Sequence, residues 1–253
     1  AFSLASASEY LDRLTDKGFP VDTIASNLML NLSVGPHYFI EIAKFRVARL
    51  LFSSLLKAWK IQNTQHADIY IHATTSERNQ TVFDPYMNML RGTTGGMSAI
   101  LGGVDSLTIQ PFGKSFRKPT DFGERIARNT QIILKEEAYF DKVKDAAGGA
   151  YYIERITDSL AEAAWDLFRL TEKNGGFSAS LKSGFIQNTI QNNARKQDLD
   201  LATRKQILVG TNQYPDPDEK PNFDCETMVA FPVNQSSNNS FSVPVTPYRA
   251  STA

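Results

Sequence analysis

One histidine stands where an α/β protein places reactive groups. His72 lies near the end of the run Asp-Ile-Tyr-Ile-His-Ala-Thr-Thr-Ser at positions 68–76, which has the pattern of a strand and leads through a polar loop into a helix. Barrel-type α/β enzymes carry their catalytic groups at the carboxyl ends of such strands. His72 could therefore donate a proton or contact a cofactor, and the alternative is a hydrogen-bonded structural histidine.

The remaining metal-ligating residue types are scattered. His37 lies near a predicted helix start and His66 in a polar loop, so both are expected at the surface. Three unclustered histidines make a poor metal site, and we predict none. The single cysteine, Cys225, excludes an intrachain disulfide framework and fits a reducing cytoplasm.

A second candidate site follows the strand predicted at residues 105–110. The run Gly-Lys-Ser around Lys114 has the outline of a phosphate-binding loop, but it lacks the spaced glycines of a P-loop. A solvated loop lysine is the plainer interpretation. Glu136 and Glu137 are adjacent, so they point to different sides of a helix and cannot form an acid/base pair. The residues alone therefore define no reaction.

Charge and hydropathy exclude several classes of partner. Twenty-seven basic residues balance 27 acidic ones, so no basic surface argues for nucleic acid or for an anionic membrane. No segment approaches the roughly 18 apolar residues that a membrane span requires. We expect a cytoplasmic protein without a membrane or nucleic-acid partner.

The hydrophobic periodicity alternates between strand and helix. Helices are predicted at 3–17, 36–59, 84–101, 119–134, 159–173 and 177–195, and strands at 27–34, 68–76, 105–110 and 206–210. This alternation predicts a parallel sheet. About four to five strands are too few for a closed barrel, so the sheet is either open or the second half of a barrel. Residues 212–253, rich in Pro, Asn, Ser and Asp, are predicted to form a linker or wrapping arm. Because the chain begins at Ala1 without methionine and ends abruptly at Ala253, we expect it to be an excised piece.

Six runs in order carry a resemblance to a known family. They are Phe-Ile-Glu-Ile-Ala-Lys-Phe-Arg-Val-Ala-Arg at 39–49, Phe-Asp-Pro-Tyr-Met-Asn at 83–88, Pro-Thr-Asp-Phe at 119–122, Arg-Ile-Ala-Arg-Asn-Thr-Gln at 125–131, Ala-Gly-Gly-Ala-Tyr at 147–151 and Leu-Val-Gly-Thr-Asn at 208–212. Over residues 1–214 the chain resembles the methylmalonyl-CoA mutase family. The resemblance implies an isomerase that interconverts methylmalonyl-CoA and succinyl-CoA with adenosylcobalamin, using a (β/α)8 barrel and a separate corrin-binding domain.

The resemblance also implies a domain plan. Residues 1–211 would be the second half of the (β/α)8 barrel, and residues 212–253 an arm leading to a further domain. The first half, outside this chain, would carry the Tyr, Arg and His that hold substrate. The corrin-binding Asp-x-His-x-x-Gly motif does not occur around any histidine of this chain.

The positions that would face ligand depart from the family pattern. His72 matches a strand-end histidine near the corrin and adenosine, but Thr74 stands where active subunits have Gln, and Ser-Glu-Arg at 76–78 replaces Ser-Gly-Trp. Asp105, Gln110 and Lys114 replace Gln, Asn and Glu, and Asn27 and Met29 replace the Arg and Ser of the coenzyme A side. A lysine cannot accept the hydrogen bonds that Glu accepts.

This divergence is the pattern of the non-catalytic small subunit of a heterodimeric mutase. On that hypothesis the chain has no catalytic residue, supports a large catalytic subunit, binds no cobalamin and keeps His72 as the vestige of a cofactor site. One alternative is a fragment of an active or divergent adenosylcobalamin-dependent acyl-CoA mutase. Another is an unrelated α/β enzyme that uses His72 and Lys114 on a phosphorylated substrate. We also expect the chain to self-associate through open sheet edges.

Overall fold

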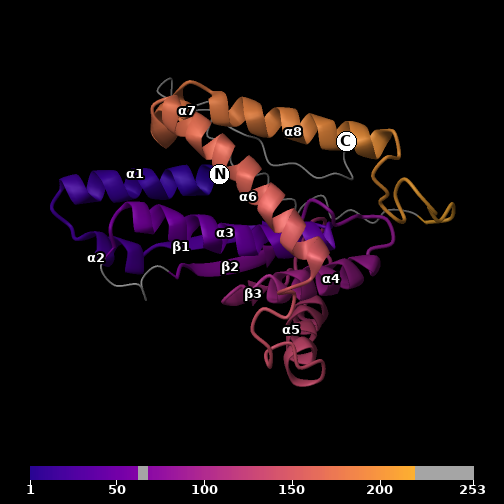
Figure 1. The fold of residues 1–253 in the computed structure, drawn as a ribbon. Coiled ribbons are helices and arrows are strands. Elements are labelled where there is room, and N and C mark those ends of the chain that lie inside the picture. The colour runs from indigo at the N-terminus through magenta and orange to yellow at the C-terminus, as the bar shows by residue number, and fades with distance from the viewer. Residues whose placement is uncertain (62–67, 220–253) are drawn as a thin grey trace.

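The computed structural model describes residues 1–61 and 68–219, and the chain within these ranges is α/β (Figure 1). Its helices are α1 (Phe2–Asp16), α2 (Val21–Ser26), α3 (Tyr38–Ala58), α4 (Met87–Leu101), α5 (Asp121–Glu136), α6 (Tyr151–Lys173), α7 (Gly176–Lys182) and α8 (Phe185–Ala202), and its strands are β1 (Met29–Val34), β2 (Tyr70–Thr75) and β3 (Ser106–Thr108). None of the helices in these ranges is long and apolar enough to cross a membrane.

The described strands form one parallel sheet in the order β1-β2-β3. Helix α3 connects β1 to β2, and α4 connects β2 to β3, which are the crossover connections that parallel strands require. The register places Asn31 beside His72 and His72 beside Ser106. The parallel sheet predicted from the alternating pattern is confirmed.

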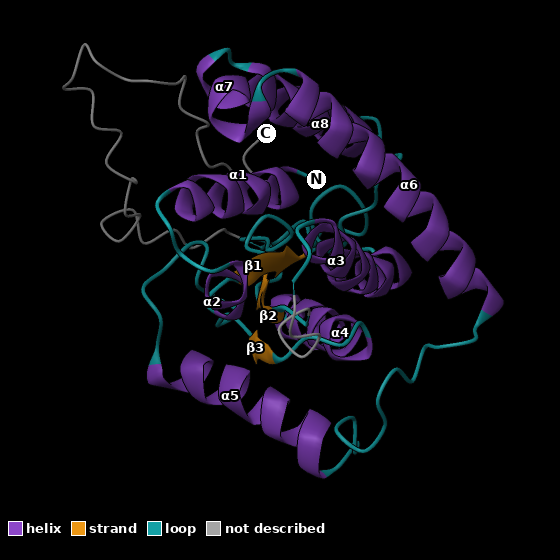
Figure 2. Ribbon diagram, turned by 60° about the vertical axis from the view of Figure 1, so that its left-hand side comes forward, coloured by secondary structure: helices purple, strands orange, loops and turns teal. Residues whose placement is uncertain are grey.

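Helices α3 and α4 cover one face of the sheet (Figure 2). Glycines on α4 allow it to lie close to the strands. An added Cβ at Gly96 would stand 2.9 Å from Ile109 Cδ1, and one at Gly92 would stand 3.2 Å from Ile109 Cγ2. The apolar residues of β1 and β2 that face these helices, including Val34, Ile71 and Ala73, belong to the main core. The glycines that weaken α4 as an isolated helix therefore serve its packing.

A further group of helices lies beyond α3. Helix α6 packs across α3, and α1 contacts α6 and α7 (Figure 1). An ion pair between Arg46 of α3 and Glu154 of α6, with 2.7 Å between Nη2 and Oε1, fixes the start of α6. Glu9 of α1 accepts hydrogen bonds from the backbone N–H and hydroxyl of Ser178, at 2.7 and 2.5 Å, at the start of α7.

Several predicted elements are wrong or displaced. The strand expected at 206–210 does not form; Asn212 Oδ1 accepts from the Leu208 N–H at 2.7 Å, so the segment folds back on itself. Only three strands lie in the described ranges, against the four to five expected. Helix α6 already begins at Tyr151, whereas the helix was predicted to begin at residue 159. Gly184, with φ of 80°, separates α7 from α8 where one helix was expected, and α2 was not predicted.

Two predictions fall partly outside the described residues. His66 lies outside them, and so does the arm predicted at 212–253 beyond residue 219. The described residues thus form an α/β chain with a three-stranded parallel sheet.

Candidate functional site

Mostly polar side chains, together with Met29 and Tyr70, occupy the sheet face opposite α3 and α4. Side chains alternate along a strand, so residues next to the helix-facing Val34, Thr75 and Leu107 point the other way. The residues on this opposite face are Met29, Asn31, Ser33, Tyr70, His72, Thr74, Ser106 and Thr108. All are at least partly exposed. A face that buried apolar groups would carry Val, Ile or Leu at these positions, so this face is built to meet polar groups.

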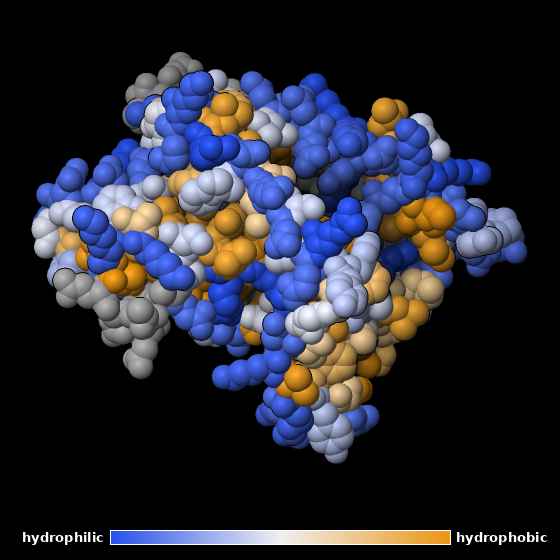
Figure 3. Space-filling model, viewed as in Figure 1, coloured by the Kyte–Doolittle hydropathy of each residue, from blue (hydrophilic) through white to orange (hydrophobic). Residues whose placement is uncertain are grey.

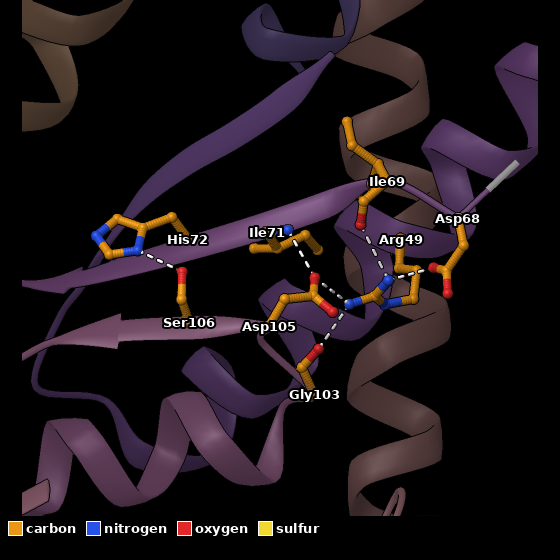
Figure 4. A network of polar contacts seen from close by, with 8 residues as sticks. All are labelled: Arg49, Asp68, Ile69, Ile71, His72, Gly103, Asp105 and Ser106. Atoms are coloured by element: carbon orange, nitrogen blue, oxygen red, sulfur yellow. Dashed lines mark hydrogen bonds and ion pairs between the residues drawn. The ribbon is translucent and has the colours of Figure 1, made fainter. Parts of the chain in front are cut away.

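His72 is held at both ring nitrogens by its neighbours on this face. Its Nδ1 lies 2.6 Å from Ser106 Oγ, a contact drawn in Figure 4, and its Nε2 lies 3.3 Å from Thr108 Oγ1. Ser106 is the direct register partner of His72, so β3 supplies the contact. His72, expected at a strand end, instead lies in the middle of β2, because that strand continues to Thr75. It is half buried, and its hydrogen bonds link β2 to β3.

Asp105 lies at the opposite end of the strands from the predicted site. Its Oδ2 accepts hydrogen bonds from the Ile71 N–H at 2.7 Å and from Arg49 Nη2 at 3.0 Å. Arg49 also donates to the carbonyl oxygens of Ile69 and Gly103 and pairs with Asp68 (Figure 4). Asp105 thus anchors the start of β3 to α3 instead of joining Gln110 and Lys114 at the carboxyl end.

This network stabilises the charge on Arg49. Burial alone would lower its pKa, but the hydrogen bonds and charges of Asp68 and Asp105 outweigh burial and raise the pKa above its ordinary value. The guanidinium therefore stays charged. Its N–H groups donate to carboxylate and carbonyl oxygens of the segments that precede β2 and β3. Sequence reasoning missed this role, since only the helical run containing Arg49 was visible.

The other predicted ligand positions are spread out. Lys114 is exposed in the turn after β3, where its N–H donates to the Pro111 carbonyl at 2.9 Å. Gln110 uses its backbone N–H, which donates to Thr75 Oγ1 at 2.8 Å. Asn27 ends α2 and donates from Nδ2 to the Thr23 carbonyl at 2.8 Å, while Met29 is 58% exposed on the polar face. These residues do not form one binding constellation with His72.

A small polar cavity lies at the carboxyl ends of β1 and β2. It has a volume of about 220 Å³ and is lined by residues from three stretches of the chain, namely Ser33, Gly35, Pro36, His37, Glu41 and Lys44, then Ser76, Arg78 and Asn79, and then Gln197, Leu201, Gln206 and Leu208. The buried Glu41 pairs with Lys44, which also donates to the Ser33 carbonyl at 2.5 Å. His37, expected at the surface, is exposed and lines this cavity.

Within residues 1–61 and 68–219, no group of three or more His, Cys, Asp or Glu side chains is arranged to hold a metal ion.

The family model that matches this chain, over residues 1–241, is that of methylmalonyl-CoA mutase. The chain belongs to the methylmalonyl-CoA mutase family.

Named relatives of this family include both kinds of subunit. The chain is 46% identical over 215 residues to the methylmalonyl-CoA mutase small subunit of Porphyromonas gingivalis, covering 85% of this chain and 35% of that protein. It is 35% identical over 221 residues to the large subunit of the same organism, covering 87% of this chain and 31% of that protein. It is 38% identical to the small subunit of Streptomyces virginiae, with 87% and 35% covered. The chain thus spans about a third of the length of these relatives.

The adenosylcobalamin that this family implies does not fit His72 as the structure arranges it. Both imidazole nitrogens are engaged by Ser106 and Thr108, so neither is directed at a further group. Lys114, after β3, offers only donors, whereas the resemblance implies an acceptor at this position.

Proposed function

We propose that this chain is part of the small subunit of a methylmalonyl-CoA mutase and supports a catalytic large subunit without an active site of its own. The observation that carries the proposal is the difference between the two Porphyromonas gingivalis relatives, 46% identity to the small subunit against 35% to the large one. The intramolecular hydrogen bonds of His72 support it, because they leave that residue a structural task.

The fold proposal is that residues 1–211 form the second half of a (β/α)8 barrel and that residues 212–253 lead to another domain. Three parallel strands with connecting helices on one face are the repeat from which such barrels are built. A barrel would turn the polar face of β1, β2 and β3 inward. Adenosylcobalamin then belongs to the complete enzyme and is held by its other parts.

The proposed partner is the large mutase subunit, in a heterodimer located in the cytoplasm. Apart from that partner, the chain is expected to associate with copies of itself. Apolar side chains gather over α4 and α5 (Figure 3), and Leu90, Phe122, Ile132 and Ile133 on these helices are about half exposed. Both edge strands, β1 and β3, also leave backbone groups open to pairing.

The pairing is tested by co-purifying the intact protein with a tagged large mutase subunit. A stable one-to-one complex by light scattering is expected, with the unpaired protein forming oligomers of its own. A monodisperse monomer that does not bind the large subunit would contradict the proposal.

The second candidate is a fragment of an active or divergent adenosylcobalamin-dependent acyl-CoA mutase. The retained His72 and the polar sheet face favour it, because both could meet a polar ligand. It requires the complete protein to contain a corrin-binding Asp-x-His-x-x-Gly motif, so sequencing the whole reading frame separates the two candidates.

A further inference from the structure

One ion pair joins two walls of the cavity at the carboxyl ends of β1 and β2, namely the loop after β2 and helix α8. Arg78 Nη2 of the loop after β2 lies 3.0 Å from Asp198 Oδ1 of α8. The partners are 120 positions apart in the sequence, and their side chains are only 27% and 29% exposed. A pair this shielded from water is stronger than an ordinary surface pair.

The loop wall is ordered locally around Arg78. The Ser76 N–H donates to the Val34 carbonyl at 2.9 Å, which continues the β1–β2 ladder, and Ser76 Oγ accepts from the Arg78 N–H at 3.2 Å. The Gln80 N–H donates to the Glu77 carbonyl at 3.1 Å. These bonds define a turn but do not reach α8, so Arg78 is the residue of this turn that connects it to α8 by an ion pair.

The α8 wall is anchored at its ends. The buried residues of α8 are Ile186, Gln187 and Leu201, which leaves the stretch between Gln187 and Leu201 without a buried side chain. After the helix, Asn212 Nδ2 donates to the Leu201 carbonyl at 2.9 Å, and Arg91 Nη2 donates to the Val209 carbonyl at 2.7 Å. The end of α8 is therefore a fixed support, and Asp198 projects from it toward the loop.

We propose that Arg78 and Asp198 form a latch that holds the loop at 76–80 against α8 and keeps these two walls of the cavity together. Gln197 and Leu201, on either side of Asp198, line the cavity together with Ser76 and Asn79 of the loop. Releasing the latch separates these walls and exposes the carboxyl ends of β1 and β2. The latch itself depends only on contacts of this chain. Its role, which is to restrict access to the strand ends in a subunit without its own active site, rests on the proposed function.

Hydrogen–deuterium exchange on the intact protein tests the latch. Asp198→Ala should raise exchange in a peptide covering residues 76–80 about fivefold, because loop opening then costs less. Alanine favours the helix more than aspartate does, so faster exchange in the distant loop cannot come from a weakened α8. Arg78→Ala should raise exchange at least as much, and the charge exchange Arg78→Asp with Asp198→Arg should restore protection relative to either single reversal.

The matched control is an Arg–Asp ion pair within a single helix, which does not connect the loop to α8. Arg169 and Asp166 of α6 lie 2.6 Å apart with both side chains 67% exposed, so Arg169→Ala should leave the loop unchanged. Unchanged exchange in Asp198→Ala, or a charge exchange that fails to restore protection, would overturn the latch. Turnover by the protein alone would overturn the proposed function and leave the exchange result intact.

Discussion

Arg49 of α3 and Asp105 at the start of β3 lie 3.0 Å apart, and the same carboxylate oxygen accepts the N–H of Ile71 from β2 at 2.7 Å. One side chain thus connects a helix and two strands at the amino ends of the sheet. Truncation leaves a backbone donor and part of a guanidinium without their acceptor.

Asp105→Ala should therefore lower the free energy of unfolding by about 1–3 kcal/mol, the usual cost of an unsatisfied polar group. Asp105→Asn is the control, because its amide oxygen still accepts from Ile71 while the charge is lost, and it should cost less. Urea denaturation measures both. Equal losses in the two variants would contradict the assigned role.

The contact between α3 and α4 is tightest at Gly102. A Cβ there would stand 3.0 Å from Phe45 Cβ and 3.1 Å from the Ile42 carbonyl oxygen. This backbone oxygen cannot move away as the end of a flexible side chain can. Gly102→Ala should cost about 1–3 kcal/mol of stability because the helices must separate.

Gly95 is the matched control on the same helix. A Cβ at Gly95 meets its nearest neighbour at the ordinary distance of 3.5 Å. Gly95→Ala should leave stability unchanged or raise it by up to about 1 kcal/mol through helix propensity. A larger loss at Gly95 than at Gly102, in the same urea experiment, would show that α4 does not pack as described.

His72 and Ser106 should behave as one unit. His72→Ala and Ser106→Ala each remove the 2.6 Å contact, so each should cost about 1 kcal/mol, and the double variant should cost less than the sum. Neither should change turnover by the complete mutase. A loss of turnover in His72→Ala with unaltered stability would return His72 to the cofactor site.

Glu172 carries a pH dependence of stability. Its partial burial and the charges of Glu9 and Asp12 raise its pKa above the ordinary value of 4.5. A carboxyl with a raised pKa favours the folded state when protonated, and this contribution is lost as the pH rises through the folded-state pKa. At neutral pH the ionised Glu172 is therefore unfavourable.

Glu172→Gln should raise the melting temperature at pH 7 by about 1–2 °C, a small gain because the side chain is still largely hydrated. The gain should fade as the pH drops below the ordinary range of a glutamate. Glu162→Gln on the exposed side of α6 is the control and should have no effect. A gain that persisted in acid would contradict the assignment.

The sequence predicts those parts of the fold that local patterns determine. Alternating Leu30, Leu32 and Val34 located β1, and the apolar spacing of residues 39–55 located α3, because one buried face dictates each pattern. The apolar run at 206–210 looked the same locally but is not a strand, since Asn212 takes its backbone bonds.

The site was less predictable because its contacts are long-range. His72 was singled out from a predicted position near a strand end, whereas it lies in the middle of β2 and its two hydroxyl partners come from β3. Asp105 was grouped with Gln110 and Lys114 as a ligand-facing position, but it lies before β3, at the opposite end of that strand from both. Arg78 was noticed as a departure from the family pattern, whereas its partner Asp198 follows 120 residues later and carries no local signal.

The central claim, a family member without its own active site, is tested most directly by turnover. Purified intact protein, purified large mutase subunit and their mixture are each supplied with methylmalonyl-CoA and adenosylcobalamin, and succinyl-CoA is measured. We predict no product and no bound cobalamin with this protein alone, and more product from the mixture than from the large subunit alone. Succinyl-CoA formed by this protein alone would contradict the account.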